Sequence, residues 1–144
     1  MKIIINLIGF LLFFVFFNSY AYWILTQDDD KISEIKNKRD LLLIFSMKKS
    51  YWDDGHPIIL IVLPSNNKVH QDFIRNNLGI SSNILDNIWD INVHSGNKSP
   101  PIVVNSKDEM INLIRNTEGS IGYVYTNHIP GLSSVDITDL VDDK

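Results

Sequence analysis

The sequence predicts one α/β domain with a largely parallel sheet, and three observations lead to this fold class. Short, β-branched apolar runs alternate with longer segments of helical periodicity, which is the pattern of strands joined by helices. The chain has 144 residues, enough for one domain with a sizeable core and too few for two. No interior linker, internal repeat or low-complexity tract interrupts it.

Composition and charge exclude several classes of protein. Lys and Arg total 13 and Asp and Glu total 17, and the net charge of −4 provides no basic face for nucleic acid. The chain has no cysteine, which excludes disulfides, thiolate metal sites, a cysteine nucleophile and a lipidated N-terminal cysteine. A domain without disulfides must draw its stability from its core.

The N-terminus has the features of a secretory signal peptide. Lys2 gives a positive start, residues 3–17 form an apolar run, and the small residues Ser19 and Ala21 stand at the −3 and −1 positions. We expect cleavage after Ala21, which leaves residues 22–144 as the mature domain. The alternative is an uncleaved anchor, although a helix over 3–17 would span only ~22 Å against ~30 Å for a hydrocarbon core. Both alternatives place the domain outside the cytoplasmic membrane.

The first half of the domain predicts two strands and one long helix. Residues 22–26 form a short apolar strand, and the acidic residues 28–30 suit the start of a helix. Apolar residues at helical spacing then predict a helix over 31–47 that covers the sheet. Asp54-Gly55 indicates a tight turn. Residues 58–63 are continuously apolar and β-branched, as in a strand buried on both faces.

The second half alternates helices and strands. We expect a helix over 69–78 that ends at Gly79, and another from Ser81-Ser82 to a loop that begins at residue 92. Ser106 and Glu109 form a capping box, which predicts a helix that ends near residue 119. The strands are expected at 102–104, 121–125 and, at the edge, 135–137.

A candidate anion-binding site follows the buried strand. Ser65, Asn66, Asn67 and Lys68 lie between that strand and a helix, and ligands of open α/β sheets gather beyond the carboxyl ends of the strands. Backbone N–H groups at a helix N-terminus attract anions, and these side chains would add a hydroxyl, two amides and an ammonium. The alternative is that Ser65 or Asn66 only caps the helix.

A second loop with hydrogen-bond donors contains Ser95, Gly96 and Lys98. We expect an ordinary surface turn before Pro100. The alternative is a second ligand-binding loop that faces the first one.

The remaining polar and aromatic residues predict neither catalysis nor a metal or cofactor site. No two histidines are three or four residues apart, so we expect them on the surface or in loops. The adjacent Asp53 and Asp54 are expected to be solvated, and no nucleophile-elbow, P-loop or zinc-protease motif occurs. Packing in and beside the core is the expected role of the large aromatic residues, and the alternative is a binding platform. The histidines are His56, His70, His94 and His128, and the aromatic residues are Trp23, Trp52, Trp89, Tyr51 and Tyr123.

Several short motifs occur in one order along the domain: Leu43-Ile44-Phe45, then Tyr51-Trp52-Asp53-Asp54-Gly55-His56-Pro57, then Phe73-Ile74-Arg75-Asn76-Asn77-Leu78-Gly79, then Ile88-Trp89 with Val93-His94-Ser95-Gly96, then Pro100-Pro101, and Gly119-Ser120-Ile121-Gly122-Tyr123-Val124. In this order they resemble the periplasmic phosphate-binding-type solute-binding proteins of ABC transporters. The resemblance implies a single-lobe, periplasmic-binding-protein-like (type 2) sandwich, with a mostly parallel sheet of four to five strands flanked by helices. It also implies a periplasmic location.

The chain departs from the family where the family holds its anion. Family members carry an R-x-x-G-S-G-T stretch after the strand, whereas residues 63–69 here contain neither arginine nor glycine. One hypothesis is therefore an exported module that binds phosphate or another oxyanion, linked to phosphate transport by the resemblance. The other is a domain that has kept the fold, lost the ligand and contacts a periplasmic or membrane protein. A homodimer would supply the second wall that a single lobe lacks.

Overall fold

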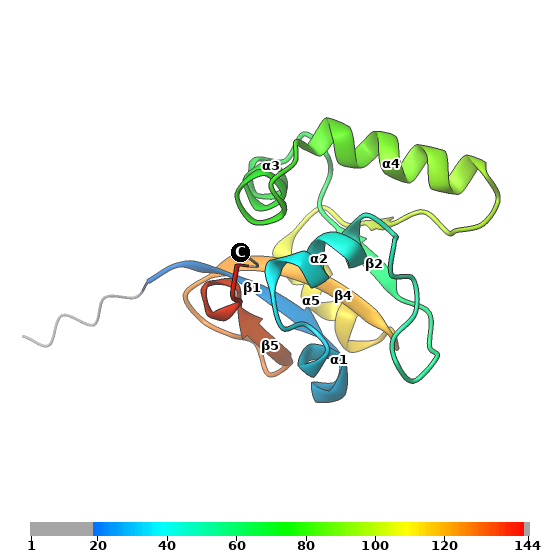
Figure 1. Ribbon diagram of the computed structural model, residues 1–144. Coiled ribbons are helices and arrows are strands. Elements are labelled where there is room, and N and C mark those ends of the chain that lie inside the picture. Colours follow the sequence, from blue (N-terminus) through cyan, green and yellow to red (C-terminus); the bar gives the residue numbers. More distant parts are fainter. Residues whose placement is uncertain (1–18, 143–144) are drawn as a thin grey trace, which may run out of the picture.

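A five-stranded sheet forms the centre of the domain in the computed structural model, which describes residues 19–142 (Figure 1). The strands are β1 (Ala21–Thr26), β2 (Ile59–Val62), β3 (Ile102–Val103), β4 (Ser120–Thr126) and β5 (Ser133–Asp136), in the order β3-β2-β4-β1-β5. β2 pairs in parallel with β3 and β4, while β1 is antiparallel to β4 and β5. Four strands thus share one direction and β1 opposes them. The predicted α/β class is confirmed, and the sheet is mixed, with two parallel and two antiparallel pairings.

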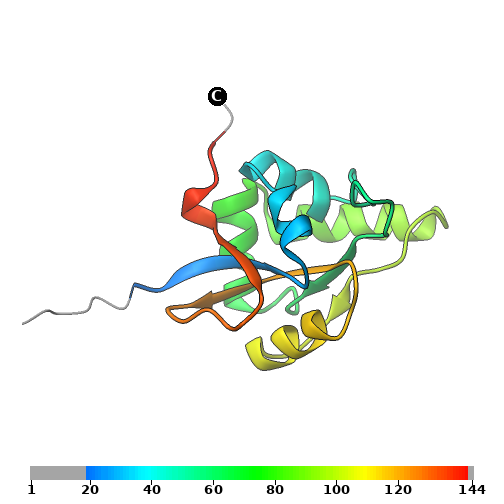
Figure 2. The same cartoon turned by 90° about the horizontal axis from the view of Figure 1, so that it is seen from below.

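Helices cover both faces of the sheet (Figure 2). α5 (Lys107–Arg115) lies on one face, and α2 (Lys38–Phe45), α3 (Lys68–Phe73) and α4 (Ser82–His94) lie on the other. The short α1 (Asp29–Ser33) packs beside β1 and β5. A π-helical turn, η1 (Ile74–Leu78), continues α3, and a 3-10 turn, η2 (Ile137–Asp139), follows β5.

β4 shows how alternating side chains join the two layers. Gly122 faces α5 so closely that a Cβ there would lie 2.8 Å from Ile114 Cδ1. Tyr123 points to the opposite face, where its ring stacks on Phe73 at 4.0 Å between centroids. Phe45 meets the same Phe73 ring edge-on at 5.4 Å. The aromatic core is therefore built between β4, α2 and α3.

The predicted helix over 31–47 is wrong as a single helix. The chain leaves the helical conformation after Ser33. α2 begins at Lys38, and Asn37 is its N-cap. The Asn37 side chain accepts from Asp40 N at 2.9 Å, and the Asp40 carboxylate accepts from Asn37 N at 3.2 Å. This reciprocal capping box starts a second helix, although the apolar residues keep their helical spacing through the break.

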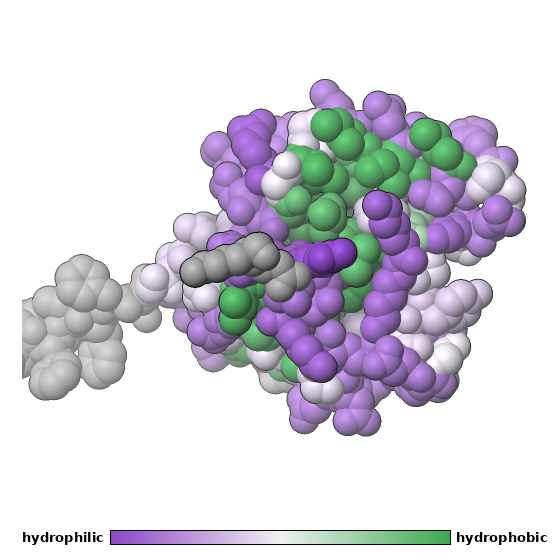
Figure 3. Space-filling view, viewed as in Figure 1, coloured by the Kyte–Doolittle hydropathy of each residue, from purple (hydrophilic) through white to green (hydrophobic). Residues whose placement is uncertain are grey.

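The loop predicted from residue 92 is also wrong at its start, because α4 continues to His94 and Gly96 then takes a left-handed φ of 76°. α4 buries Leu85 and Trp89 and leaves Ile84 and Ile91 exposed. Figure 3 shows hydrophobic side chains gathered over α4 and between α4 and α2. None of the helices within residues 19–142 combines the length and apolar character needed to cross a bilayer.

The signal-peptide prediction falls mainly on residues 1–18, which lie outside the described residues. Ala21, after which we expect cleavage, is the first residue of β1 and pairs with Thr126. The boundary between a signal peptide and the domain stays a prediction.

Candidate functional site

The turn between β2 and α3 holds the first group of predicted site residues. Asn67 is the N-cap of α3, and its side-chain oxygen accepts from Val69 N at 2.9 Å and His70 N at 3.2 Å. Asn67 N in turn donates to Pro64 O at 2.8 Å. Two of the backbone N–H groups that would have attracted an anion, those of Val69 and His70, are therefore bonded to the Asn67 side chain.

The other three residues of this group point to carboxylates or to solvent. The Ser65 hydroxyl donates to Asp86 Oδ1 on α4 at 2.9 Å. Lys68, whose side chain is 87% exposed, has its Nζ 3.3 Å from Asp72 Oδ2. Asn66 is exposed. The structure thus brings Ser65 beside a negative charge.

Ser65 lies on the wall of a pocket of about 380 Å³ between the end of β2, α4 and β3. Trp89 contributes apolar wall, and Asp86 and Asp90 contribute two carboxylates one helical turn apart. The Trp89 ring is held in place because its Nε1 donates to Phe45 O at 2.7 Å. The space beyond the carboxyl end of β2 is therefore both apolar and acidic.

The second group of predicted site residues does not meet the first. Ser95 caps the C-terminus of α4 and donates to Asn92 O at 2.8 Å, and Gly96 follows it. Between Asp86, which contacts Ser65, and Ser95 the helix rises by ~13 Å. Lys98 donates to Met47 O and lines a different pocket of about 310 Å³, together with Lys49.

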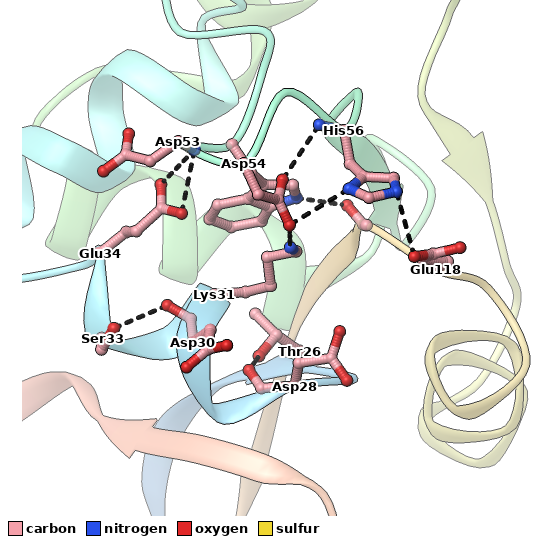
Figure 4. A network of polar contacts seen from close by, with 12 residues as sticks. Thr26, Asp28, Asp30, Lys31, Ser33, Glu34, Asp53, Asp54, His56 and Glu118 are labelled. Carbon is pink, nitrogen blue, oxygen red and sulfur yellow. Dashed lines mark hydrogen bonds and ion pairs between the residues drawn. The ribbon is translucent and has the colours of Figure 1, made fainter.

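A polar network outside both loops connects α1 to the turn before β2 (Figure 4). Lys31 is 4% exposed, and its ammonium pairs with the carboxylate of Asp54. His56 places Nδ1 3.1 Å from Asp54 Oδ2 and Nε2 3.2 Å from Glu118 Oε1. The hydrogen bond from Lys31, followed by that from His56 N, holds the pKa of the Asp54 carboxyl well below its usual range. Asp54 was expected to be only solvated, and the sequence carries no signal that a lysine 23 residues away is buried against it.

Glu34 anchors the same turn from α1. Its carboxylate accepts from Asp53 N at 3.1 Å and pairs with Lys49 Nζ at 2.6 Å. Trp52 closes the turn from inside, since its Nε1 donates to Gly119 O at 2.9 Å. The network joins three separate segments of the chain, and its role is to hold the fold together.

His70 corrects the expectation that the histidines lie at the surface or in loops. It lies on α3 with 0% exposure, and its Nδ1 contacts the hydroxyl of Tyr123. That hydroxyl also accepts from Leu63 N at 3.0 Å, whereas His70 Nε2 is buried without a hydrogen-bond partner among the described residues. Burial lowers the pKa of His70 and raises that of Tyr123.

The core role predicted for the aromatic residues is confirmed for Trp52, Trp89 and Tyr123, which are buried, and Trp23 packs against the core. It is wrong for Tyr51, which is 63% exposed. No cluster of three or more potential metal ligands occurs within residues 19–142.

The fold is that of the periplasmic solute-binding proteins, and solved structures of this class match most of the chain. A substrate-binding protein with bound phosphate from Clostridium perfringens, described as part of a phosphate ABC transporter, has a TM-score of 0.61 at 13% identity and covers 85% of this chain. An ABC-type phosphate transport receptor from Vibrio cholerae gives 0.56 at 14% identity over 82%. PstS from Borrelia burgdorferi gives 0.51 at 21% identity over 74%.

The chain spans less than half of each of these proteins, between 40% and 46% of their length. At such identities the similarity establishes the fold. Neither a family model nor a curated protein matches the chain.

Proposed function

We propose that this chain is an exported domain of the solute-binding fold that acts by contacting another protein and lacks an oxyanion site at Ser65 to Lys68. One observation carries the proposal: two backbone N–H groups at the start of α3 and the Ser65 hydroxyl are already bonded to the protein's own acceptors. Asn67 Oδ1 takes two backbone N–H groups, and Asp86 takes the Ser65 hydroxyl.

Electrostatics at the turn also oppose an oxyanion. A phosphate near Ser65 would lie beside the Asp86 carboxylate, and like charges about 4 Å apart repel by roughly 4 kcal/mol near a protein surface. Lys68 is too exposed to offset this, because surface ion pairs contribute only about 0–1 kcal/mol.

Oxyanion binding is the second candidate, and the exposed Lys68 ammonium at the ligand-binding edge of the sheet favours it. This binding would be weak and sensitive to salt, because Lys68 is 87% exposed. The matched solved structures supply the class of ligand, phosphate.

Equilibrium dialysis with labelled phosphate tests the proposal. The protein is expressed as the full chain and purified from the cell envelope, alongside the variants Ser65→Ala and Lys68→Ala. We expect no saturable binding in millimolar phosphate. Saturable binding that either variant abolishes would overturn the proposal in favour of the second candidate.

A further inference from the structure

The groove at the carboxyl end of β2 combines a pocket with an open sheet edge. β3 is the outermost strand of the sheet, and it pairs only with β2 among residues 19–142. Val104 N donates to Val62 O at 2.9 Å, so the N–H and C=O of the preceding Val103 point away from β2. Val103 is 58% exposed and also lines the pocket.

The lining of this groove carries two carboxylates and, among residues 19–142, no basic side chain. Asp86 and Asp90 are one turn apart on α4 and both line the pocket. Within the described part of the chain neither carboxylate has an ion pair, and the Ser65 hydroxyl contacts only one oxygen of Asp86. The Trp89 ring and two prolines provide the apolar wall that a long cationic side chain packs against.

We propose that this groove binds an extended segment of a partner protein that adds to the free edge of β3 and inserts an arginine or lysine side chain between Asp86 and Asp90. The proposal rests on the proposed function and names the chemistry of the partner. Charge complementarity selects a basic side chain, since both free carboxylates accept charge-assisted hydrogen bonds. The outward N–H and C=O of Val103 select an extended backbone.

The length of β3 limits this interaction to a short contact. β3 has two residues, which leaves one outward-facing residue to pair with the partner. Most of the affinity must therefore come from the side chain in the pocket, and binding should depend on the two carboxylates more than on the strand edge.

The test uses short blocked peptides with arginine at the centre and mixed residues elsewhere, compared with the same pool carrying citrulline at the centre. Citrulline has the shape of arginine without its charge. The isotope-labelled protein, expressed as the full chain, is titrated with each pool and followed by nuclear magnetic resonance. We expect the arginine pool to shift the amide of Val103 and to bind at least about tenfold more tightly than the citrulline pool.

Two variants check the two parts of the groove. Asp86→Asn with Asp90→Asn should remove the preference for arginine, whereas Asp108→Asn, on α5 at the opposite face, should keep it. Val103→Pro deletes the outward N–H without touching the bond between Val104 and Val62, and should weaken binding by a smaller factor.

The proposal is overturned if both pools bind equally, if neither binds, or if the Asp86 and Asp90 variant keeps its preference. It is also overturned if acetyl-arginine amide alone binds as tightly as the peptides, because the groove would then be a small-molecule site. Such failures leave the proposed function standing, which only saturable phosphate binding would contradict.

Discussion

Lys31 and Asp54 form an ion pair in which the two partners have unequal access to water. Lys31 is buried, whereas the Asp54 side chain is 45% exposed. Removing Asp54 leaves a buried ammonium without a counter-charge, whereas removing Lys31 leaves a carboxylate that water can solvate. The free energy of unfolding should therefore fall more for Asp54→Asn than for Lys31→Met, as measured by urea denaturation at neutral pH.

The same pair makes stability depend on acid. The folded pKa of Asp54 lies below its unfolded value, so its contribution is present above about pH 4 and is lost as the pH falls further. Unfolding midpoints at pH 5 and pH 3 should therefore differ less in Asp54→Asn than in the parent. An unchanged difference would mean that Asp54 does not bind Lys31 in solution.

The buried His70 side chain should make the free energy of unfolding depend on pH in a second, higher range. Burial lowers its pKa, so the unfolded chain binds the proton first and stability falls as the pH drops through about 6.5. His70→Gln should reduce the loss of unfolding free energy between pH 7.5 and pH 5. His128→Gln, at an exposed position, is the control, and it should lose as much unfolding free energy over this pH range as the parent does.

Gly119 occupies a position that other residues cannot adopt without strain. Its φ is +74°, and a Cβ there would lie 2.5 Å from Pro57 O. Gly119→Ala should cost about 1–3 kcal/mol of unfolding free energy or more. Gly131→Ala is the matched control, because no atom lies within 4 Å of its Cβ position, and it should stay within about 0.5 kcal/mol. Equal effects in denaturant would contradict the packing at Gly119.

At the scale of elements, the β2–α3 turn is a capped helix start. Asn67→Ala removes the acceptor of two N–H groups and should cost about 1 kcal/mol of unfolding free energy. The neighbouring Asn66→Ala, at an exposed position, should change it by less than about 0.5 kcal/mol. Calorimetric unfolding of both variants measures the difference, and similar losses would show that Asn67 is not the cap.

Elements set by local signals could be predicted from the sequence. β2 and α5 were recognisable because an uninterrupted β-branched run and a Ser106 capping box are local features. The break between α1 and α2 was not, because the hydrophobic periodicity continues through it. Asn37 and Asp40 form a capping box there with an Asp in the place where Glu or Gln is usual.

At the scale of the whole molecule, the fold class could be predicted and the site could not. Alternating strands and helices define an α/β sandwich whatever the loops contain. Bringing Ser65 to Asp86, and separating it from Lys98, depends on where α4 lies against β2, which no short motif encodes. Asp86 and Asp90 were detectable only as carboxylates one turn apart on a predicted helix.

The measurement that tests the central claim most directly is thermal unfolding of the purified protein in phosphate, sulfate and chloride at equal ionic strength. A ligand at ~100 times its dissociation constant adds about 2.7 kcal/mol of stability, which is an easily measured shift of the melting temperature. We predict that phosphate raises the melting temperature no more than sulfate does, because both anions stabilise folded proteins relative to chloride without binding a site. A rise in phosphate alone, kept in added salt and lost in Ser65→Ala with Lys68→Ala, would contradict the account and restore an oxyanion site to the β2–α3 turn.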